Sequence, residues 1–149
     1  SIMIFAEFYV GQIIEAGPIQ VSETEIIEFA KQFDPQWFHI NPEEAATGHF
    51  DGLIASGWHT CCLVMRLIAD KVLEGSESYA SPGLAYLKWM HPVRPNDALS
   101  VKAHVLEVRF SASNPSRGIL RWRWDAFQQD NIQVLELEAT SMFDMKIKR

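Results

Sequence analysis

Cysteine, positive charge and long apolar runs are all scarce in this sequence of 149 residues. Its two cysteines, Cys61 and Cys62, are adjacent in an apolar segment, which suits free thiols of a core better than a structural disulfide. Because stable disulfides mark oxidising compartments, this usage favours a reducing one. We therefore expect a cytoplasmic protein.

Lysine and arginine number 13 against 19 aspartates and glutamates, so the formal net charge is -6. This charge disfavours nucleic acid as the main partner, because binding phosphates requires a basic surface. A polybasic membrane contact is disfavoured for the same reason. No apolar run approaches the roughly 20 residues that a membrane-spanning helix needs, so no membrane association is expected.

The overall composition is that of a folded domain, with 48% hydrophobic and 21% charged residues. A chain of this length can bury one substantial core but not two. No internal repeat or linker interrupts it. The sequence therefore predicts a single domain over residues 1–149.

The first half of the chain contains three helix starts. Ser22 followed by Glu25 forms a capping box, and the apolar spacing after it predicts a helix over 23–33. A second, short helix is expected after Asn41, an N-cap residue followed by proline. Residues 36–40 lie between them without a clear period and are predicted to form a loop that aromatic side chains hold against the core.

A third helix is predicted over 57–73, where apolar residues occupy nearly every side and glycine stands at the start. Ser56 is its expected N-cap, and the helix is expected to be enclosed by the rest of the domain. Four strands are predicted over 84–92, 99–110, 118–128 and 132–145, after a loop over 76–83. Early helices and late antiparallel strands predict an α+β fold, with a sheet curled around the buried helix.

The residues with the clearest chemical potential are an acid and an imidazole five positions apart, Asp34 and His39, in a segment rich in aromatics. Carboxylate and imidazole can hold one water and exchange its protons. Neighbouring aromatics would desolvate Asp34, so its pKa is expected to be raised. Alone, the pair is also compatible with a helix end and a loop hydrogen bond. His59 is interpreted as an interior histidine, and no metal is expected, since His49 and Asp51 complete no recognised ligand spacing.

Taken in order, these features resemble a known family. The chain resembles the MaoC-like dehydratases, which are relatives of (R)-specific enoyl-CoA hydratases with the hot dog fold. The resemblance is carried by the capped helix, the Asp-x-x-x-x-His pair, the Phe50-x-Gly-Leu-Ile-Ala-Ser-Gly57 segment and the His91-Pro-Val-x-Pro-x-Asp97 turn before the last strands. The resemblance covers nearly the whole chain. The commonest hydratase motif has Asn-Pro where this chain has Gln36 and Trp37, and His where it has Ser56.

The resemblance implies hydration or dehydration of acyl thioesters. Asp34 and His39 would be catalytic, and the amide N–H of Gly57, at the positive end of the helix, is the expected oxyanion donor. No cofactor is implied apart from the coenzyme A thioester as substrate, and the expected partners are acyl-CoA or acyl carrier protein and a second copy in a homodimer. Substrate contacts are expected from Ser56, Trp37, Gln36, Ile54, Ala55 and Trp58.

Two alternatives keep the same fold. An acyl-CoA thioesterase would use a carboxylate on the central helix, where Asp70 is the only acid within the apolar stretch. A non-catalytic acyl-CoA-binding subunit would retain the pocket without turnover. Thiol release separates the first alternative from a hydratase, and binding without turnover identifies the second.

Overall fold

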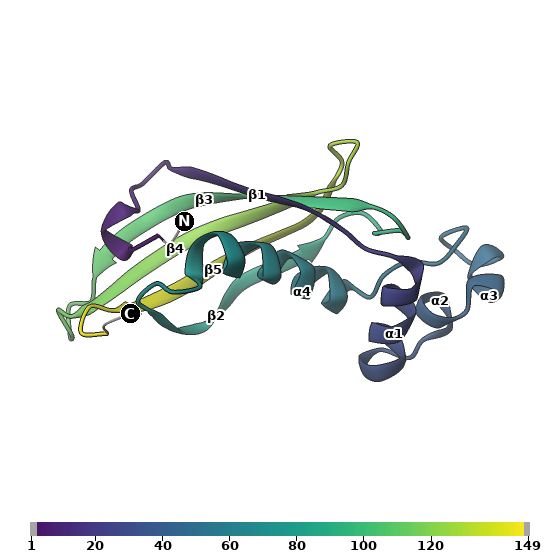
Figure 1. Cartoon of the computed structure of the whole chain (residues 1–149), viewed down its shortest axis with the longest axis horizontal. Helices are drawn as coiled ribbons and strands as arrows, with labels where there is room; N and C mark the ends of the chain where they lie inside the picture. Colours follow the sequence, from purple (N-terminus) through teal and green to yellow (C-terminus); the bar gives the residue numbers. More distant parts are fainter. Residues whose placement is uncertain (1–2, 148–149) are drawn as a thin grey trace.

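Five antiparallel strands curve around one central helix in the computed structural model, which describes residues 3–147 (Figure 1). The strand order is β1-β3-β4-β5-β2, so β1 and β2 are the edges of a sheet that does not close. The α+β prediction is confirmed. The elements are η1 (Phe5–Glu7), β1 (Ile13–Gln20), α1 (Glu23–Phe33), α2 (Trp37–Ile40), α3 (Pro42–Ala46), α4 (Gly57–Ile68), η2 (Ala69–Leu73), β2 (Ser78–Trp89), β3 (Ala98–Phe110), β4 (Arg117–Phe127) and β5 (Gln133–Asp144).

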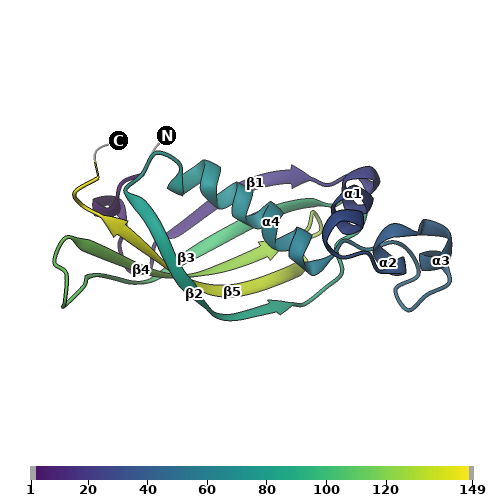
Figure 2. The same cartoon turned by 90° about the horizontal axis from the view of Figure 1, so that it is seen from below.

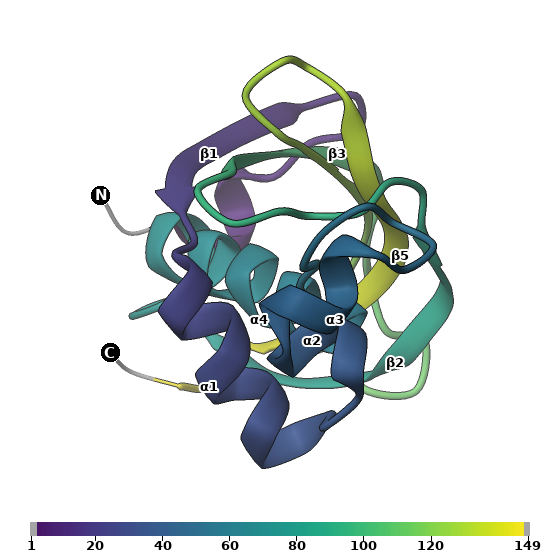
Figure 3. The same cartoon turned by 90° about the vertical axis from the view of Figure 1, so that its right-hand side faces the viewer.

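The core lies between the concave face of the sheet and α4, as the end-on view shows (Figure 3). Val64 and Ile68 of α4 are fully buried against alternate residues of the strands, among them Leu120 and Trp122 of β4. Period-two burial along β4 and β5 places apolar side chains on this face and polar ones on the other. Trp122 and Trp124, two positions apart on one face of β4, are both buried in this core.

The central helix begins at Gly57 and continues beyond Ile68 through one π-helical turn, η2, to Leu73. The expectation that this helix is enclosed is wrong on one side. Trp58 is 59% exposed, Met65 is 41% exposed and Cys62 is exposed too, and their spacing of four and three residues aligns them as one stripe. Among residues 3–147, none of the helices is long and apolar enough to cross a membrane.

Strands β3, β4 and β5 follow their predicted positions closely, whereas β2 differs at its start. That strand begins at Ser78, inside the predicted loop over 76–83, and ends at Trp89. Pro82 and Gly83 suggested a loop, but an edge strand tolerates both residues, and the register with β5 shifts between Ala80 and Gly83. The sheet is therefore longer on its β2 edge than predicted.

Helices α1, α2 and α3 lie together beyond the N-terminal end of α4 (Figure 2). Ser22 caps α1 and exchanges two hydrogen bonds with Glu25, as the capping box predicts. The loop predicted over 36–40 is wrong, because Trp37–Ile40 form one helical turn, closed by a bond from the Asn41 N–H to the Trp37 carbonyl. This turn directs His39, not Trp37, into the interior.

Candidate active site

The end of α1 and the turn of α2 bring the predicted acid and imidazole into contact. Asp34 ends α1, and Nε2 of His39 lies 3.3 Å from Oδ2 of Asp34. On the other side of the ring, Nδ1 of His39 lies 2.7 Å from the carbonyl oxygen of Ile54. Each ring nitrogen therefore faces an oxygen atom to which it donates a hydrogen bond whenever it carries a proton. His39 is 5% exposed, so its orientation is fixed by burial as well as by these contacts.

Two side chains donate hydrogen bonds to the carboxylate of Asp34. Ser56 Oγ donates to Oδ2 and Gln36 Nε2 donates to Oδ1, each at 2.7 Å. They are two of the positions at which this chain departs from the commonest hydratase motif. At these two positions this chain therefore supplies donors to the carboxylate, and the acid and imidazole remain side by side.

The predicted direction of the Asp34 pKa is wrong. Burial does raise the pKa, but the hydrogen bonds from Ser56 and Gln36 and the charge of His39 outweigh it and leave the pKa of Asp34 below its usual range. The aromatic neighbours desolvate the carboxyl less than expected, since Phe33 is 64% exposed and Trp37 is 40% exposed. Asp34 is consequently a carboxylate at neutral pH.

The start of α4 lies next to this pair. Ser56 is fully buried and its Oγ accepts a bond from the Trp58 N–H at 3.3 Å, which confirms it as the N-cap. The N–H of Gly57 belongs to the first turn of α4, where amides have no partner inside the helix and carry positive potential. A side chain at this position would force the indole of Trp89 to shift, because an added Cβ would lie 2.5 Å from it.

A cavity of about 290 Å³ connects the imidazole to this glycine. His39, Ile54, Ala55 and Gly57 all line it, so the structure brings together four of the predicted site residues. The end of β2 and the segment directly after it supply most of the opposite wall. Its further lining residues are Phe50, Thr60, Trp89, Met90, His91, Pro92, Val93 and Val134.

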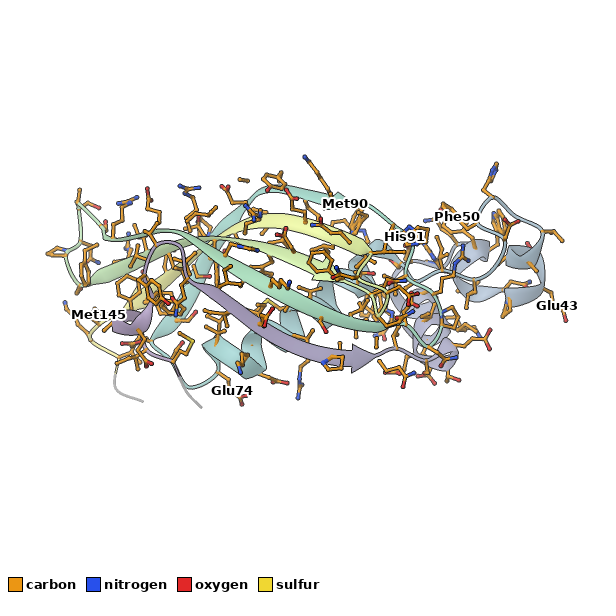
Figure 4. All side chains as sticks on the ribbon, turned by 90° about the horizontal axis from the view of Figure 1, so that it is seen from above. Glu43, Phe50, Glu74, Met90, His91 and Met145 are labelled. Carbon is orange, nitrogen blue, oxygen red and sulfur yellow. The ribbon has the colours of Figure 1, made fainter. Side chains whose placement is uncertain are left out.

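These additional wall residues were not identified from the sequence. Phe50 and His91 come from separate segments and lie near one another at the junction between the sheet and the helices (Figure 4). A bond from the Ala55 N–H to the Val93 carbonyl, at 2.8 Å, joins the two segments. The His91-Pro-Val turn was recognised in the sequence as a family feature. The sequence alone did not show that this turn faces the cavity.

The remaining predicted contacts are dispersed. Trp37 lines a different hollow of about 410 Å³, together with Gly48 and Phe50, and Trp58 lines a third cavity beside α4. Gln36 is exposed and reaches the site only through Asp34.

Other titratable groups lie apart from the pair. His59 is buried and stacks on Phe29, with ring centroids 4.5 Å apart, as an interior histidine would. Asp70 is exposed at the opposite end of the helix and bonds Arg66 at 2.9 Å, so it offers no acid near Gly57. Within residues 3–147, no group of three His, Cys, Asp or Glu side chains is arranged to hold a metal ion.

The sheet, the central helix and the open edges define a hot dog fold. Protein Rv0216 of Mycobacterium tuberculosis, described as a double hotdog fold, superposes with a TM-score of 0.77 over 97% of this chain and 46% of its own, at 15% identity. At that identity the likeness shows the fold alone.

The chain belongs to the MaoC-like domain family, whose model matches residues 7–117. The uncharacterised protein YdeM of Bacillus subtilis is 32% identical over 137 residues, which cover 90% of this chain and 94% of YdeM. The MaoC-like dehydratase of Rhodospirillum rubrum is 33% identical with a TM-score of 0.88, covering 96% of this chain and 97% of its own. The (R)-hydratase PhaJ1 of Pseudomonas aeruginosa is 27% identical with a TM-score of 0.77, covering 97% and 90%.

Proposed function

We propose that the protein is a hydro-lyase that adds water to a 2-enoyl thioester, or removes it from the 3-hydroxyacyl thioester, using Asp34 and His39. The observation that carries the proposal is the contact of 3.3 Å between this carboxylate and this imidazole, beside the N-terminus of α4 and at a cavity that Gly57 shares. Family membership and the likeness to an (R)-hydratase support the same reaction class.

The proposed reaction uses an ionised Asp34 and a proton on each ring nitrogen of His39. The ionised Asp34 accepts a proton from the water whose oxygen bonds the β-carbon, and Nε2–H of His39 donates its proton to the α-carbon. The proton on Asp34 Oδ2 then passes to Nε2 of His39 across the 3.3 Å contact, which restores both groups. Nδ1–H stays bonded to the Ile54 carbonyl throughout, so the ring does not turn.

The amide of Gly57 completes this mechanism. Negative charge develops on the thioester oxygen when the double bond is attacked, and a free amide at a helix N-terminus stabilises it. The glycine lets the thioester approach the backbone closely. Coenzyme A and acyl carrier protein are both carriers that would present such a thioester.

A homodimer is part of the proposal. Strand β2 is an edge of the sheet, and its backbone groups on the outer side are free to pair with another strand. The exposed stripe of α4 and Leu84 of β2, which is 49% exposed, supply apolar surface near that edge. Light scattering of the purified protein should give twice the mass of the 17.0 kDa chain, and a monomer at micromolar concentration would contradict the dimer.

The reaction is tested with the purified protein and a short 2-enoyl-CoA, by following the loss of ultraviolet absorbance from the conjugated thioester and the appearance of 3-hydroxyacyl-CoA. Hydration without thiol release supports the proposal. Release of free thiol would replace it with a thioesterase. Tight binding without turnover across a panel of chain lengths would replace it with a non-catalytic acyl-CoA-binding subunit.

A further inference from the structure

Two cavities follow one another along the same three elements. The catalytic cavity takes Gly57 and Thr60 from α4, Trp89 from β2 and Val134 from β5. The second cavity, of about 410 Å³, takes residues further along each of these elements and is lined mainly by apolar side chains. They include Cys61 and Met65 of α4, Leu84 and Leu87 of β2, and Leu137 and Ala139 of β5.

Two tryptophans occupy the boundary between these cavities. The indole of Trp89 lies directly on Gly57, where an added Cβ would be 2.5 Å from its Cε2 atom. The ring of Trp58 meets it edge to face, with centroids 5.3 Å apart and an interplanar angle of 81°. Trp89 lines the catalytic cavity and Trp58 lines the second one, so the pair separates the two spaces.

The second cavity begins one turn further along α4, where Cys61 is one of its lining residues. An acyl chain whose thioester sits at Gly57 would meet the indole before it reached the second cavity.

We propose that Trp89, supported by Trp58, sets the acyl-chain length that the site accepts, confining it to short acyl groups. The inference rests on the proposed function, because the thioester must lie at Gly57 for the indole to face the chain. Removing the indole would join the catalytic cavity to the apolar cavity between α4, β2 and β5. A longer acyl chain would then bury its methylene groups there.

The exposure of the pair makes this testable by substitution. Trp89 is 46% exposed and Trp58 is 59% exposed, so neither ring is required to fill the core. Tyr79 is a matched control, since it lies on the same strand with 44% exposure and lines neither cavity. Trp89→Phe is the milder variant if Trp89→Ala fails to fold.

The experiment measures kcat/KM for 2-enoyl-CoA substrates of four and eight carbons. The unaltered protein should favour the four-carbon substrate by about tenfold or more, and Trp89→Ala should raise the eight-carbon value by about tenfold or more. Trp58→Ala should change the ratio in the same direction by less, and Tyr79→Ala should leave it unchanged. An unaltered protein that prefers eight carbons, or a ratio that Trp89→Ala and Trp89→Phe do not move, would overturn the inference while the reaction stands.

Failure of the reaction gives a different result. If no chain length is hydrated, the proposed function falls, and calorimetric binding of butyryl-CoA and octanoyl-CoA then tests the wall by itself. Tighter octanoyl-CoA binding by Trp89→Ala than by the unaltered protein, with butyryl-CoA binding unchanged, supports the role of Trp89. Equal octanoyl-CoA affinities would refute it.

Discussion

Ser56 both caps α4 and donates a hydrogen bond to Asp34, and the variant Ser56→Ala, compared with a second N-cap variant, measures how much each bond contributes to stability. Its hydroxyl accepts from the Trp58 N–H at 3.3 Å and donates to Asp34 at 2.7 Å, in a residue with no exposed surface. Losing an N-cap lowers the free energy of unfolding by about 1 kcal/mol. Losing a hydrogen bond to a charged group removes about 2 kcal/mol more. We expect Ser56→Ala to be about 3 kcal/mol less stable than the unaltered protein at pH 7, as measured by urea unfolding.

The part that belongs to Asp34 depends on pH in a defined direction. The folded-state pKa of Asp34 is lowered, so its contribution to stability is present above the usual aspartate pKa and is lost as the pH falls through the lowered value. Without Ser56 the folded-state pKa of Asp34 rises, because one of the hydrogen bonds that lower it is lost. The acid limb of the kcat/KM profile should therefore move to higher pH.

Ser22→Ala is the matched control, because Ser22 is also an N-cap serine but lies at the start of α1, away from the carboxylate. It should lose about 1 kcal/mol at pH 7 and leave the acid limb in place. Equal losses of stability in the two variants, or an unmoved acid limb in Ser56→Ala, would refute the coupling of Ser56 to Asp34.

Three further substitutions probe the frame of the site. Gly57→Ala places a Cβ 2.5 Å from Trp89, so its free energy of unfolding should fall by about 1–3 kcal/mol. The double variant with Trp89→Ala should lose less, because the clash is removed, and an equal or larger loss would contradict the contact. Burial lowers the pKa of His59, and the charge of Glu25 opposes this to a smaller extent. Below about pH 6.5, the ordinary histidine pKa, the unfolded chain therefore binds a proton at His59 more readily than the native state does, which lowers the free energy of unfolding. Between pH 7.5 and 5.5 the unaltered protein should lose more stability than His59→Gln, and parallel losses would show that His59 does not contribute. Trp122→Ala removes a fully buried ring and should cost about 3–5 kcal/mol in urea unfolding, whereas the exposed Trp58 should tolerate alanine with less than 1 kcal/mol; similar losses would contradict the assigned core.

Features decided by neighbouring residues could be predicted from the sequence. The caps at Ser22, Asn41 and Ser56 depend on residues within three positions, and all three form as expected. The turn after Arg94 is local as well, and Asp97 closes it with a bond from its N–H to the Arg94 carbonyl at 3.1 Å. The contact of Asp34 with His39 also follows from short spacing around one proline.

Features that depend on distant segments could not be predicted. The wall built by Trp89 lies 32 positions from Gly57 in the sequence, and no local pattern relates the two. The exposed stripe of α4 borders the open cavity beside β2 and β5, which a period count alone does not reveal. The predicted direction of the Asp34 pKa was wrong because Ser56, a donor 22 positions away, reaches the carboxylate only through folding, whereas the aromatic neighbours were visible in the sequence.

The central claim is that Asp34 and His39 carry the reaction together, and one comparison tests it most directly. Hydration of a short 2-enoyl-CoA is measured for the unaltered protein, Asp34→Asn and His39→Ala, each checked for native stability. Positioned acid and base groups contribute on the order of 10²–10⁴ in rate, so each variant should lose at least a hundredfold in kcat/KM. Turnover that both variants retain at the level of the unaltered protein would contradict the assignment of the pair.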